Sequence, residues 1–230
     1  MFAYIPARIG SKRVPKKNIK HLAGKPIICH VIENLLQCPN LQGVAVSTDS
    51  DEVKQLVDKY DKVVTLSSRT STLSGDDTGF MDLVKYDLDR FGQHFSSTDV
   101  LFTLATSALI KPHEYSAGID KFNQGQHNLV MSVTEYLHHP MLALIEDETG
   151  HLSPLHPDAY LAQTKSLPKS YIDSGNFYVF NYKTMKQHNM FLEHTPIAPI
   201  VLQANRAIDV DTMDDWHRLE ESYSEYEISR

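Results

Sequence analysis

The sequence Ala-Arg-Ile-Gly-Ser-Lys-Arg-Val-Pro-Lys-Lys-Asn, residues 7–18, follows an apolar run, 1–5, that we expect to be a strand ending at Pro6. Of the chain's 22 basic residues, five lie in this stretch: Arg8, Lys12, Arg13, Lys16 and Lys17. Gly10 and Ser11 allow the backbone to turn and offer N–H groups to an anion. A cationic turn after the first strand of an α/β fold predicts a polyphosphate site, with a solvated basic loop as the alternative.

The spacing of this loop excludes two common phosphate motifs. It contains neither Gly-x-x-x-x-Gly-Lys-Ser/Thr nor Gly-x-Gly-x-x-Gly. Basic side chains must therefore do more of the binding than a glycine nest. Such a loop suits a nucleotide triphosphate that is cleaved, because Lys and Arg can neutralise the departing pyrophosphate.

Hydrophobic periodicity predicts helices that alternate with strands along the rest of the chain. This alternation indicates one α/β domain over residues 1–230, with a mostly parallel sheet and helices on both faces. Residues 136–170 break the pattern, and we interpret them as a small insertion, with a β-arm for dimer contact as the hypothesis. The expected helices are 26–37, 51–59, 80–91, 113–123 and 214–226, and the expected later strands are 43–47, 62–66, 99–104, 128–133, 173–181 and 198–203.

Composition restricts the class of protein. A net charge of −7 and a pI near 5.9 argue against general nucleic-acid binding. Cys29 and Cys38 are too few for a disulfide framework or a four-cysteine zinc site, which favours a reducing, cytoplasmic setting. We find no signal peptide and no apolar run of about 18 residues, so we expect neither export nor a membrane span.

Four loops that follow strands, 7–18, 48–51, 105–108 and 209–211, should meet at one edge of such a sheet. Within the last of these, Asp209 and Asp211 point the same way if the segment is extended, and such a carboxylate pair suits Mg²⁺. The alternative is that Asp211 caps the last helix. Asp49 and Asp51 could also bind a metal, but their position favours helix capping.

The opening loop also resembles a family signature. Residues 5–19, Ile-Pro-Ala-Arg-Ile-Gly-Ser-Lys-Arg-Val-Pro-Lys-Lys-Asn-Ile, and residues 24–28, Gly-Lys-Pro-Ile-Ile, are similar to the acylneuraminate cytidylyltransferases, or CMP-sialic acid synthetases. These enzymes activate sialic acids and their bacterial relatives as CMP-sugars. The resemblance continues at 46–52, at 69–79 and at 207–216 and is strongest over 1–110 and 171–216.

This resemblance implies a Rossmann-like nucleotidyltransferase fold, CTP and a nonulosonic acid as substrates, Mg²⁺, and a homodimer. It implies that Asp209 and Asp211 are Mg²⁺ ligands, with Asp211 the candidate base. Charge on the departing pyrophosphate would be stabilised by Arg8, Lys12 and Lys17. The implied nucleotide-binding residues are Arg8, Gly10, Ser11, Lys12, Lys17, Asn18, Arg69, Thr78 and Thr106, with Asn18 and Thr78 at the ribose or cytosine.

Two departures bear on the substrate. Leu104 replaces a Gln that the sialic acid enzymes have and that we expect to contact the base. Ala105-Thr106 and residues 173–178 are instead more similar to the pseudaminic acid branch, although Ala108 replaces a proline of both. The alternatives are CMP transfer to another acid sugar such as ketodeoxyoctonate, whose Ser-Thr-Arg-Leu-Pro-Gly-Lys-Pro motif is absent, and a non-catalytic nucleotide-binding regulatory module.

Overall fold

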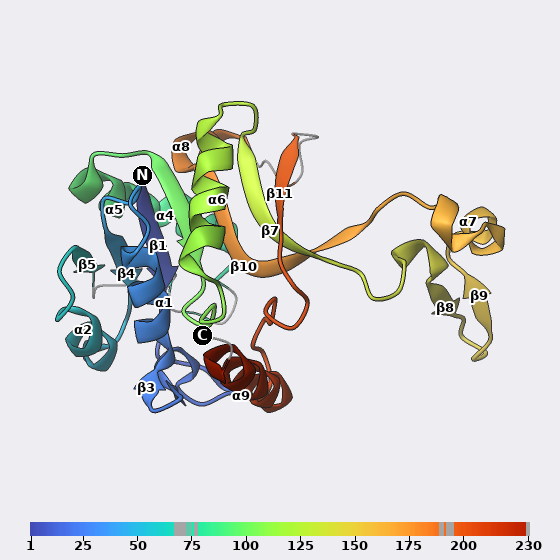
Figure 1. Ribbon diagram of the computed structural model, residues 1–230, viewed down its shortest axis with the longest axis horizontal. Helices are drawn as coiled ribbons and strands as arrows, with labels where there is room; N and C mark the ends of the chain where they lie inside the picture. The colour runs from blue at the N-terminus through green and yellow to red at the C-terminus, as the bar shows by residue number, and fades with distance from the viewer. Residues whose placement is uncertain (67–72, 74, 76–77, 189–190, 192–195, 229–230) are drawn as a thin grey trace.

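The computed structural model describes residues 1–66, 73, 75, 78–188, 191 and 196–228 and is built on a seven-stranded sheet (Figure 1). The strand order is β11-β7-β10-β6-β1-β4-β5, and β10 runs antiparallel to both of its neighbours while the other pairs are parallel. This arrangement confirms the expected mostly parallel α/β fold. The strands are β1 (Phe2–Pro6), β4 (Val44–Ser47), β5 (Val63–Leu66), β6 (Asp99–Thr103), β7 (Leu129–Glu135), β10 (Tyr171–Asn181) and β11 (Ile197–Val201).

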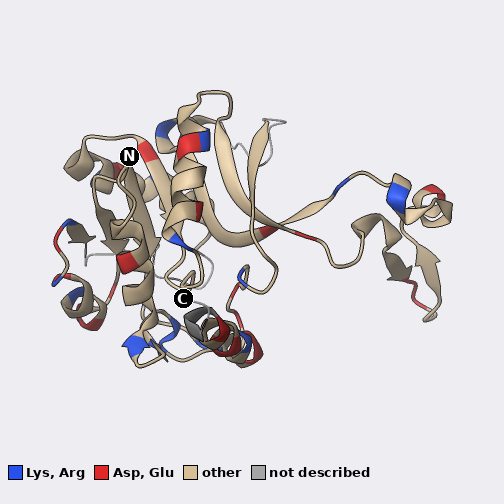
Figure 2. Ribbon diagram, viewed as in Figure 1, with Lys and Arg blue, Asp and Glu red and all other residues tan. Residues whose placement is uncertain are grey.

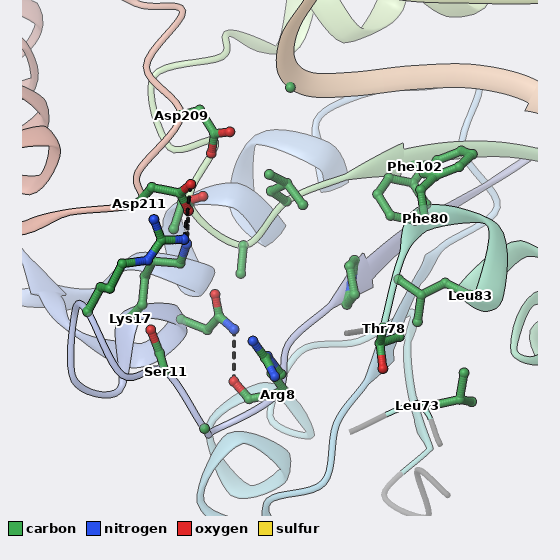
Figure 3. Close-up of a pocket in the computed structure, with 18 of the residues that line it drawn as sticks. Arg8, Ser11, Lys17, Leu73, Thr78, Phe80, Leu83, Phe102, Asp209 and Asp211 are labelled. Carbon is green, nitrogen blue, oxygen red and sulfur yellow. Dashed lines mark hydrogen bonds and ion pairs between the residues drawn. The ribbon is translucent and has the colours of Figure 1, made fainter. Parts of the chain in front are cut away.

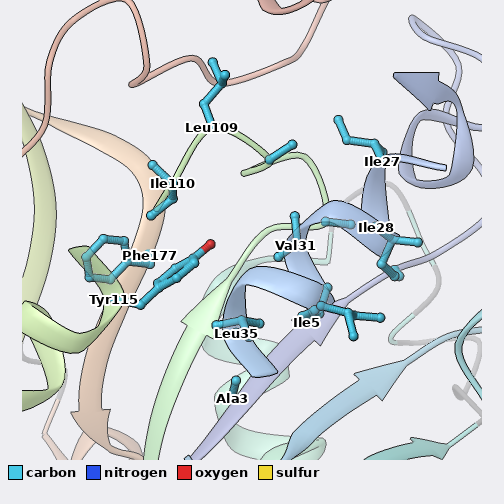
Figure 4. Packing of buried hydrophobic residues seen from close by; sticks show 14 of the residues in the cluster. Ala3, Ile5, Ile27, Ile28, Val31, Leu35, Leu109, Ile110, Tyr115 and Phe177 are labelled. Carbon is cyan, nitrogen blue, oxygen red and sulfur yellow. The ribbon is translucent and has the colours of Figure 1, made fainter. Parts of the chain in front are cut away.

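Helices cover both faces of this sheet because its central strands are apolar on both sides. Along β1, Ala3 and Ile5 face one layer of helices, and Phe2 and Tyr4 face the other. The first layer, part of which Figure 4 shows, contains α1 (Ile27–Leu36), α2 (Asp51–Val57), α6 (Pro112–Asn123) and α9 (Met213–Ile228). The second contains α4 (Phe80–Tyr86), α5 (Leu88–Phe95) and α8 (Tyr182–Gln187), the last of which the sequence analysis did not predict.

The helix expected over 80–91 is wrong in one respect, because the structure divides it into α4 and α5 at Asp87. The Asp87 side chain is fully buried and accepts a hydrogen bond from the Tyr4 hydroxyl at 2.6 Å. Arg90 also donates to it, at 3.2 Å. A buried carboxylate needs hydrogen-bond partners, and these partners hold the chain in a bend at Asp87. The spacing of apolar residues in this segment does not reveal such a bend.

Strand β10 changes register against β7 between Asp173 and Tyr178. Gly175 lies at this irregularity with φ at +69°, a conformation that side-chain-bearing residues rarely adopt. The buried Ser132 hydroxyl accepts a hydrogen bond from the Phe177 N–H at 2.8 Å and from the Ser174 hydroxyl at 2.8 Å. These contacts fix the bulge, which brings Gly175 close to the Asp209 carboxylate.

The insertion expected at 136–170 projects from the far ends of β7 and β10 (Figure 1). It contains η2 (Pro140–Leu142), β8 (Leu144–Glu146), β9 (Leu152–Pro154), α7 (Pro157–Leu161) and η3 (Thr164–Ser166), and β8 and β9 form an antiparallel pair. At its base a His139 ring nitrogen lies 2.8 Å from the Pro168 carbonyl oxygen and joins the two connecting segments. Its role in dimer contact stays a prediction.

The basic loop ends in the 3-10 helix η1 (Lys17–Ile19), and the hairpin of β2 (His21–Leu22) with β3 (Lys25–Pro26) follows it. Cys29 and His30 are buried on the face of α1 that packs against the rest of the protein. Throughout the described ranges, the helices all lack the length and apolar character that crossing a bilayer requires.

Candidate functional site

A cavity of about 600 Å³ lies at the carboxyl ends of β1 and β6 (Figure 3). It is lined by the loops after these two strands, by residues of the 73–83 segment, by β10 and by the 209–211 segment. The sequence-predicted residues that line it are Arg8, Gly10, Ser11, Lys12, Lys17, Asn18, Thr78, Thr106, Asp209 and Asp211. Arg69 lies outside the described residues, and the roles assigned to all of these side chains stay predictions.

The loop 48–51 does not line this cavity, which corrects its expected place in the site. Asp49 instead accepts a hydrogen bond from the Ile9 N–H at 2.8 Å and so supports the basic loop. The cap of α2 is Ser50, whose hydroxyl accepts hydrogen bonds from the N–H groups of Glu52 and Val53. Ser50 therefore takes the capping position expected of Asp49 and Asp51, and Asp51 lies in the first turn of the helix.

The basic loop places most of its cations in the cavity. Val14 is fully buried and anchors the loop, and Lys16 adopts a left-handed conformation with φ at 50°. This turn directs Lys16 toward Glu52 on α2, whereas Lys17 lines the cavity. The two ends of the loop are joined because the Asn18 amide donates to the Arg8 carbonyl oxygen at 2.9 Å.

Asp211 lies beside two of these cations. One Asp211 carboxylate oxygen is 3.2 Å from an Arg13 guanidinium nitrogen, and the other is 3.5 Å from the Lys17 side-chain nitrogen. Lys17 also donates to the Val210 carbonyl oxygen. Arg13 is thus also a member of the site. Its place in the basic loop was evident from the sequence, but its contact with Asp211 was not predicted.

The alternative hypothesis that Asp211 caps the last helix is wrong. The Thr212 hydroxyl accepts a hydrogen bond from the Asp215 N–H, and Asp215 in turn accepts from the backbone N–H of Thr212 at 2.9 Å. The hydrogen bonds that the Thr212 hydroxyl and backbone N–H donate to the Asp215 carboxylate lower its pKa. Because Thr212 and Asp215 satisfy the first turn of α9 between them, the Asp211 carboxylate is left to the cavity.

The carboxylates of Asp209 and Asp211 both lie at one end of the cavity (Figure 3). Displacement of water by the surrounding protein raises the pKa of the Asp209 carboxyl, and the negative charge of Asp211 raises it further. Lys17 partly opposes this effect. A hard cation is suited to two carboxylates that disfavour one another's charge, because it prefers oxygen ligands and neutralises both.

The opposite side of the cavity is apolar and aromatic (Figure 3). Phe80 packs against Phe102 with ring centroids 4.8 Å apart and against Tyr178 at 5.4 Å. The Tyr178 hydroxyl donates to Asp173 at 2.8 Å, and burial together with the charge of Asp173 raises the pKa of the phenol. This wall could not be assigned a role from the sequence, because aromatic residues in strands and helices are usually part of the core.

Asn176 joins three segments beneath the cavity. Its backbone carbonyl oxygen accepts hydrogen bonds from the hydroxyls of Thr103 at 2.8 Å and Ser107 at 3.1 Å. Its side-chain amide lies 3.5 Å from the Ile208 carbonyl oxygen. The exit of β6, the bulge of β10 and the approach to Asp209 are therefore held in one buried network.

Comparison with known proteins is consistent with this geometry. The sequence profile of the family described as Cytidylyltransferase matches residues 2–194. This chain belongs to the cytidylyltransferase family. The enzyme class expected from the sequence, a nucleotidyltransferase, is thereby confirmed, as is the family resemblance.

Relatives within the cytidylyltransferases span nearly the whole chain. A pseudaminic acid cytidylyltransferase from Campylobacter jejuni is 29% identical over 92% of this chain and 90% of the relative. A CMP-N,N'-diacetyllegionaminic acid synthase from Legionella pneumophila is 30% identical over 94% of this chain and 93% of the relative. An N-acylneuraminate cytidylyltransferase from Streptococcus agalactiae is 25% identical over 97% of this chain but 54% of the relative.

Solved structures share the fold at lower identity. A CMP:2-keto-3-deoxy-manno-octonic acid synthetase complexed with CTP superposes with a TM-score of 0.71 at 17% identity, covering 98% of each chain. A 4-diphosphocytidyl-2C-methyl-D-erythritol synthase from Anaerococcus prevotii gives a TM-score of 0.65 at 11% identity, covering 97% of this chain and 96% of the other. These likenesses confirm the expected nucleotidyltransferase-type fold.

Proposed function

We propose that this chain transfers CMP from CTP to a nonulosonic acid and releases pyrophosphate. The observation that carries the proposal is the cavity in which cations of the basic loop face two carboxylates of the 209–211 segment. Cytidylyltransferase family membership and the names of the relatives support CTP and an acid sugar as the reacting pair.

The proposed reaction is an in-line displacement at phosphorus. The anomeric hydroxyl oxygen of the sugar forms a bond to the α-phosphorus, and the bond between that phosphorus and the oxygen bridging to the β-phosphate breaks. The sugar hydroxyl loses its proton, and Asp211 is the candidate base. Arg8, Lys12 and Lys17 stabilise the negative charge that accumulates on pyrophosphate, and Arg13 lies close enough to assist.

Mg²⁺ is part of the proposal, with Asp209 and Asp211 as its protein ligands. The residues present fit this ion, because both carboxylates line the same cavity and the charge of Asp211 raises the pKa of the buried Asp209 carboxyl. Mg²⁺ usually takes one or two carboxylates and completes its coordination with water and phosphate oxygens. When bound, it would supply positive charge to the α-phosphate.

The proposed acid sugar is sialic-acid-like, with pseudaminic acid favoured. Residues Ala105-Thr106 and the 173–178 strand support the pseudaminic branch, and Leu104, Phe80 and Phe102 give the cavity an apolar wall. Such a wall suits a sugar with deoxygenated or acylated carbons, or the face of the base. The proposed nucleotide contacts further include Asn18, Thr78, Thr106 and Arg69.

A homodimer that acts in the cytoplasm completes the proposal. The projecting segment 136–170 supports the dimer because it exposes large apolar side chains, including Leu137 at 91% and Leu161 at 88% exposure. Most of this segment is drawn in tan in Figure 2, because few of its residues are Lys, Arg, Asp or Glu. A surface of this kind is typical of protein contacts.

Pyrophosphate release tests the proposed function. The full-length chain is incubated with CTP, Mg²⁺ and a panel of N-acetylneuraminic, legionaminic, pseudaminic and ketodeoxyoctonic acids. We expect release with a nonulosonic acid and none without sugar. Release with ketodeoxyoctonate alone would contradict the substrate class, and CTP binding without release for any sugar would favour the regulatory module.

A further inference from the structure

The chain that leads to Asp209 and Asp211 is fixed by an ion pair between Arg206 and Glu114. One Arg206 terminal nitrogen donates to Glu114 at 2.9 Å, and the other donates to the second oxygen of the same carboxylate. The two side chains are only 12% and 10% exposed, unlike the exposed pair between Arg13 and Asp211. This is therefore a nearly buried pair with two parallel hydrogen bonds, which fixes orientation as well as distance.

The pair joins two segments that both border the cavity. Glu114 lies in the first turn of α6 and accepts a hydrogen bond from the Lys111 N–H at 2.9 Å. The Arg206 terminal nitrogen that lies 2.9 Å from Glu114 is also 3.5 Å from the Leu109 carbonyl oxygen. The exit of β6 and the start of the 206–211 segment are thus attached to the same guanidinium group.

From Arg206 onward, backbone carbonyl groups fix the segment at alternate residues. The Ile208 carbonyl oxygen lies 3.5 Å from the Asn176 amide nitrogen, and the Val210 carbonyl oxygen accepts from Lys17. Asp209 and Asp211 alternate with these buried residues. The direction of both carboxylates therefore depends on the path of this backbone, which begins at Arg206.

Stability alone is a poor explanation for the pair. Burying two charges costs free energy that their attraction often only offsets, and apolar replacements of similar size can be equally stable. Within the described residues, the Arg206 Nε also has no hydrogen-bond partner, which adds a further cost. A costly pair at this point is better explained by the geometry that it imposes.

We propose that Arg206 and Glu114 are positioning residues that set the place of Asp209 and Asp211 for a divalent cation bound together with CTP. This inference rests on the proposed function, and it assigns to two residues outside the cavity lining an effect on metal binding. Groups that hydrogen-bond to metal ligands commonly change metal affinity by about 10–100-fold when they are replaced, and we expect the lower end of this range here because Arg206 and Glu114 act through the backbone.

The test is the coupling between Mg²⁺ and CTP, measured by calorimetry as the ratio of CTP dissociation constants in EDTA and in saturating Mg²⁺. By thermodynamic linkage, the ratio rises when Mg²⁺ binds the protein–CTP complex more tightly than it binds the free protein and free CTP. We expect Arg206→Met to lower the ratio about tenfold while the dissociation constant in EDTA changes little. A purely structural effect would weaken CTP binding in both conditions and leave the ratio unchanged.

Two further variants separate positioning from stability. The double replacement Glu114→Met with Arg206→Met removes both buried charges and should recover most of the stability, but the ratio should stay low. Lys186→Met removes an ion pair with Asp89, between α8 and α5 and outside the cavity lining, and should keep the wild-type ratio.

The outcomes are distinguishable from failure of the proposed function. A wild-type ratio in Arg206→Met, or a ratio restored in the double variant, would overturn the positioning role. Absence of CTP binding, or a ratio of one, in the wild-type protein would instead overturn the proposed function and this inference with it.

Discussion

The Lys17 side-chain nitrogen lies 3.5 Å from an Asp211 carboxylate oxygen, although the two residues are separated by nearly the whole chain. The left-handed turn at Lys16 and the short helix η1 direct Lys17 inward, and its contact with the Val210 carbonyl oxygen fixes it there. The pyrophosphate-binding and metal-binding residues that we propose are therefore adjacent in the fold.

Replacing Lys17 should reduce turnover far more than stability. We expect Lys17→Met to lower the rate of pyrophosphate release by about 10²–10³-fold, because we propose that this side chain stabilises charge that develops in the transition state. Steady-state release of pyrophosphate from CTP measures the effect. Lys16→Met is the matched control, since Lys16 pairs with the exposed Glu52 instead, and a comparable loss in both variants would contradict the role of Lys17.

Asp211→Asn should abolish turnover and leave the fold intact. The variant keeps the size of the side chain but removes the charge that we propose to hold Mg²⁺. Its ion pair with Arg13 is exposed, and the Asp211 carboxylate is itself half exposed where it meets the more buried Lys17, so the free energy of unfolding should change by at most about 1 kcal/mol. Asp214→Asn, in the first turn of α9, is the control for turnover and thermal unfolding. Near-normal activity of Asp211→Asn would refute the metal assignment.

Much of the sheet and of the cavity could be predicted from the sequence, because both depend on local patterns. The apolar runs of β1, β4 and β6 fix the central strands, and their carboxyl ends fix where the basic loop and the 105–108 loop lie. The 209–211 pair could be placed for the same reason. Its proximity to the basic loop follows from topology rather than from either motif.

The remaining features depend on contacts between distant residues. The bend at Asp87 requires Tyr4, and the place of Asp49 requires Ile9, so neither follows from the spacing of apolar residues. The aromatic wall escaped prediction because Phe80 and Tyr178 are apolar residues whose pattern also fits a core. No periodicity can distinguish an aromatic side chain that faces a cavity from one that faces another helix.

Tyr4→Phe should destabilise the protein without removing any cavity-lining group. The substitution deletes the hydroxyl that donates to the fully buried Asp87 carboxylate, which then loses one of its hydrogen bonds. We expect the free energy of unfolding in urea to fall by about 1–3 kcal/mol. Tyr86→Phe, at an exposed position of α4, should have no measurable effect, and equal behaviour of the two variants would contradict the importance of this hydrogen bond.

Stability should decline in mildly acidic solution because His30 is buried. Burial lowers the pKa of this imidazole below its usual value, so the unfolded chain binds a proton that the folded chain does not. The free energy of unfolding therefore has its full His30 contribution above the unfolded-state pKa of about 6.5 and loses it as pH falls toward the lower folded-state value.

Urea unfolding of His30→Asn at about pH 8 and about pH 5.5, either side of an ordinary histidine pKa, checks this expectation. The variant should be less stable at the higher pH, since it loses packing against Tyr223, but its stability should fall less on acidification. His94→Asn, at an exposed position of α5, should keep the wild-type pH dependence. An unchanged dependence in His30→Asn would contradict the assignment.

The projecting segment should determine the oligomeric state. Leu144 and Leu152 expose apolar side chains on β8 and β9, and replacing both with Asp places charges on a surface that we propose is covered by a second copy. Light scattering after size-exclusion chromatography should change from a dimer to a monomer. Val201→Asp adds a charge at an exposed apolar position of β11 and should leave the dimer intact. A monomeric wild-type protein would contradict the proposal.

The most direct test of the central claim is the phosphorus NMR spectrum of wild-type protein incubated with CTP, Mg²⁺ and a nonulosonic acid. We expect the CTP signals to disappear while pyrophosphate and one phosphodiester, the CMP-sugar, appear in equal amounts. CTP that remains intact with every acid sugar, or that yields free CMP with pyrophosphate and no phosphodiester, would contradict cytidylyl transfer.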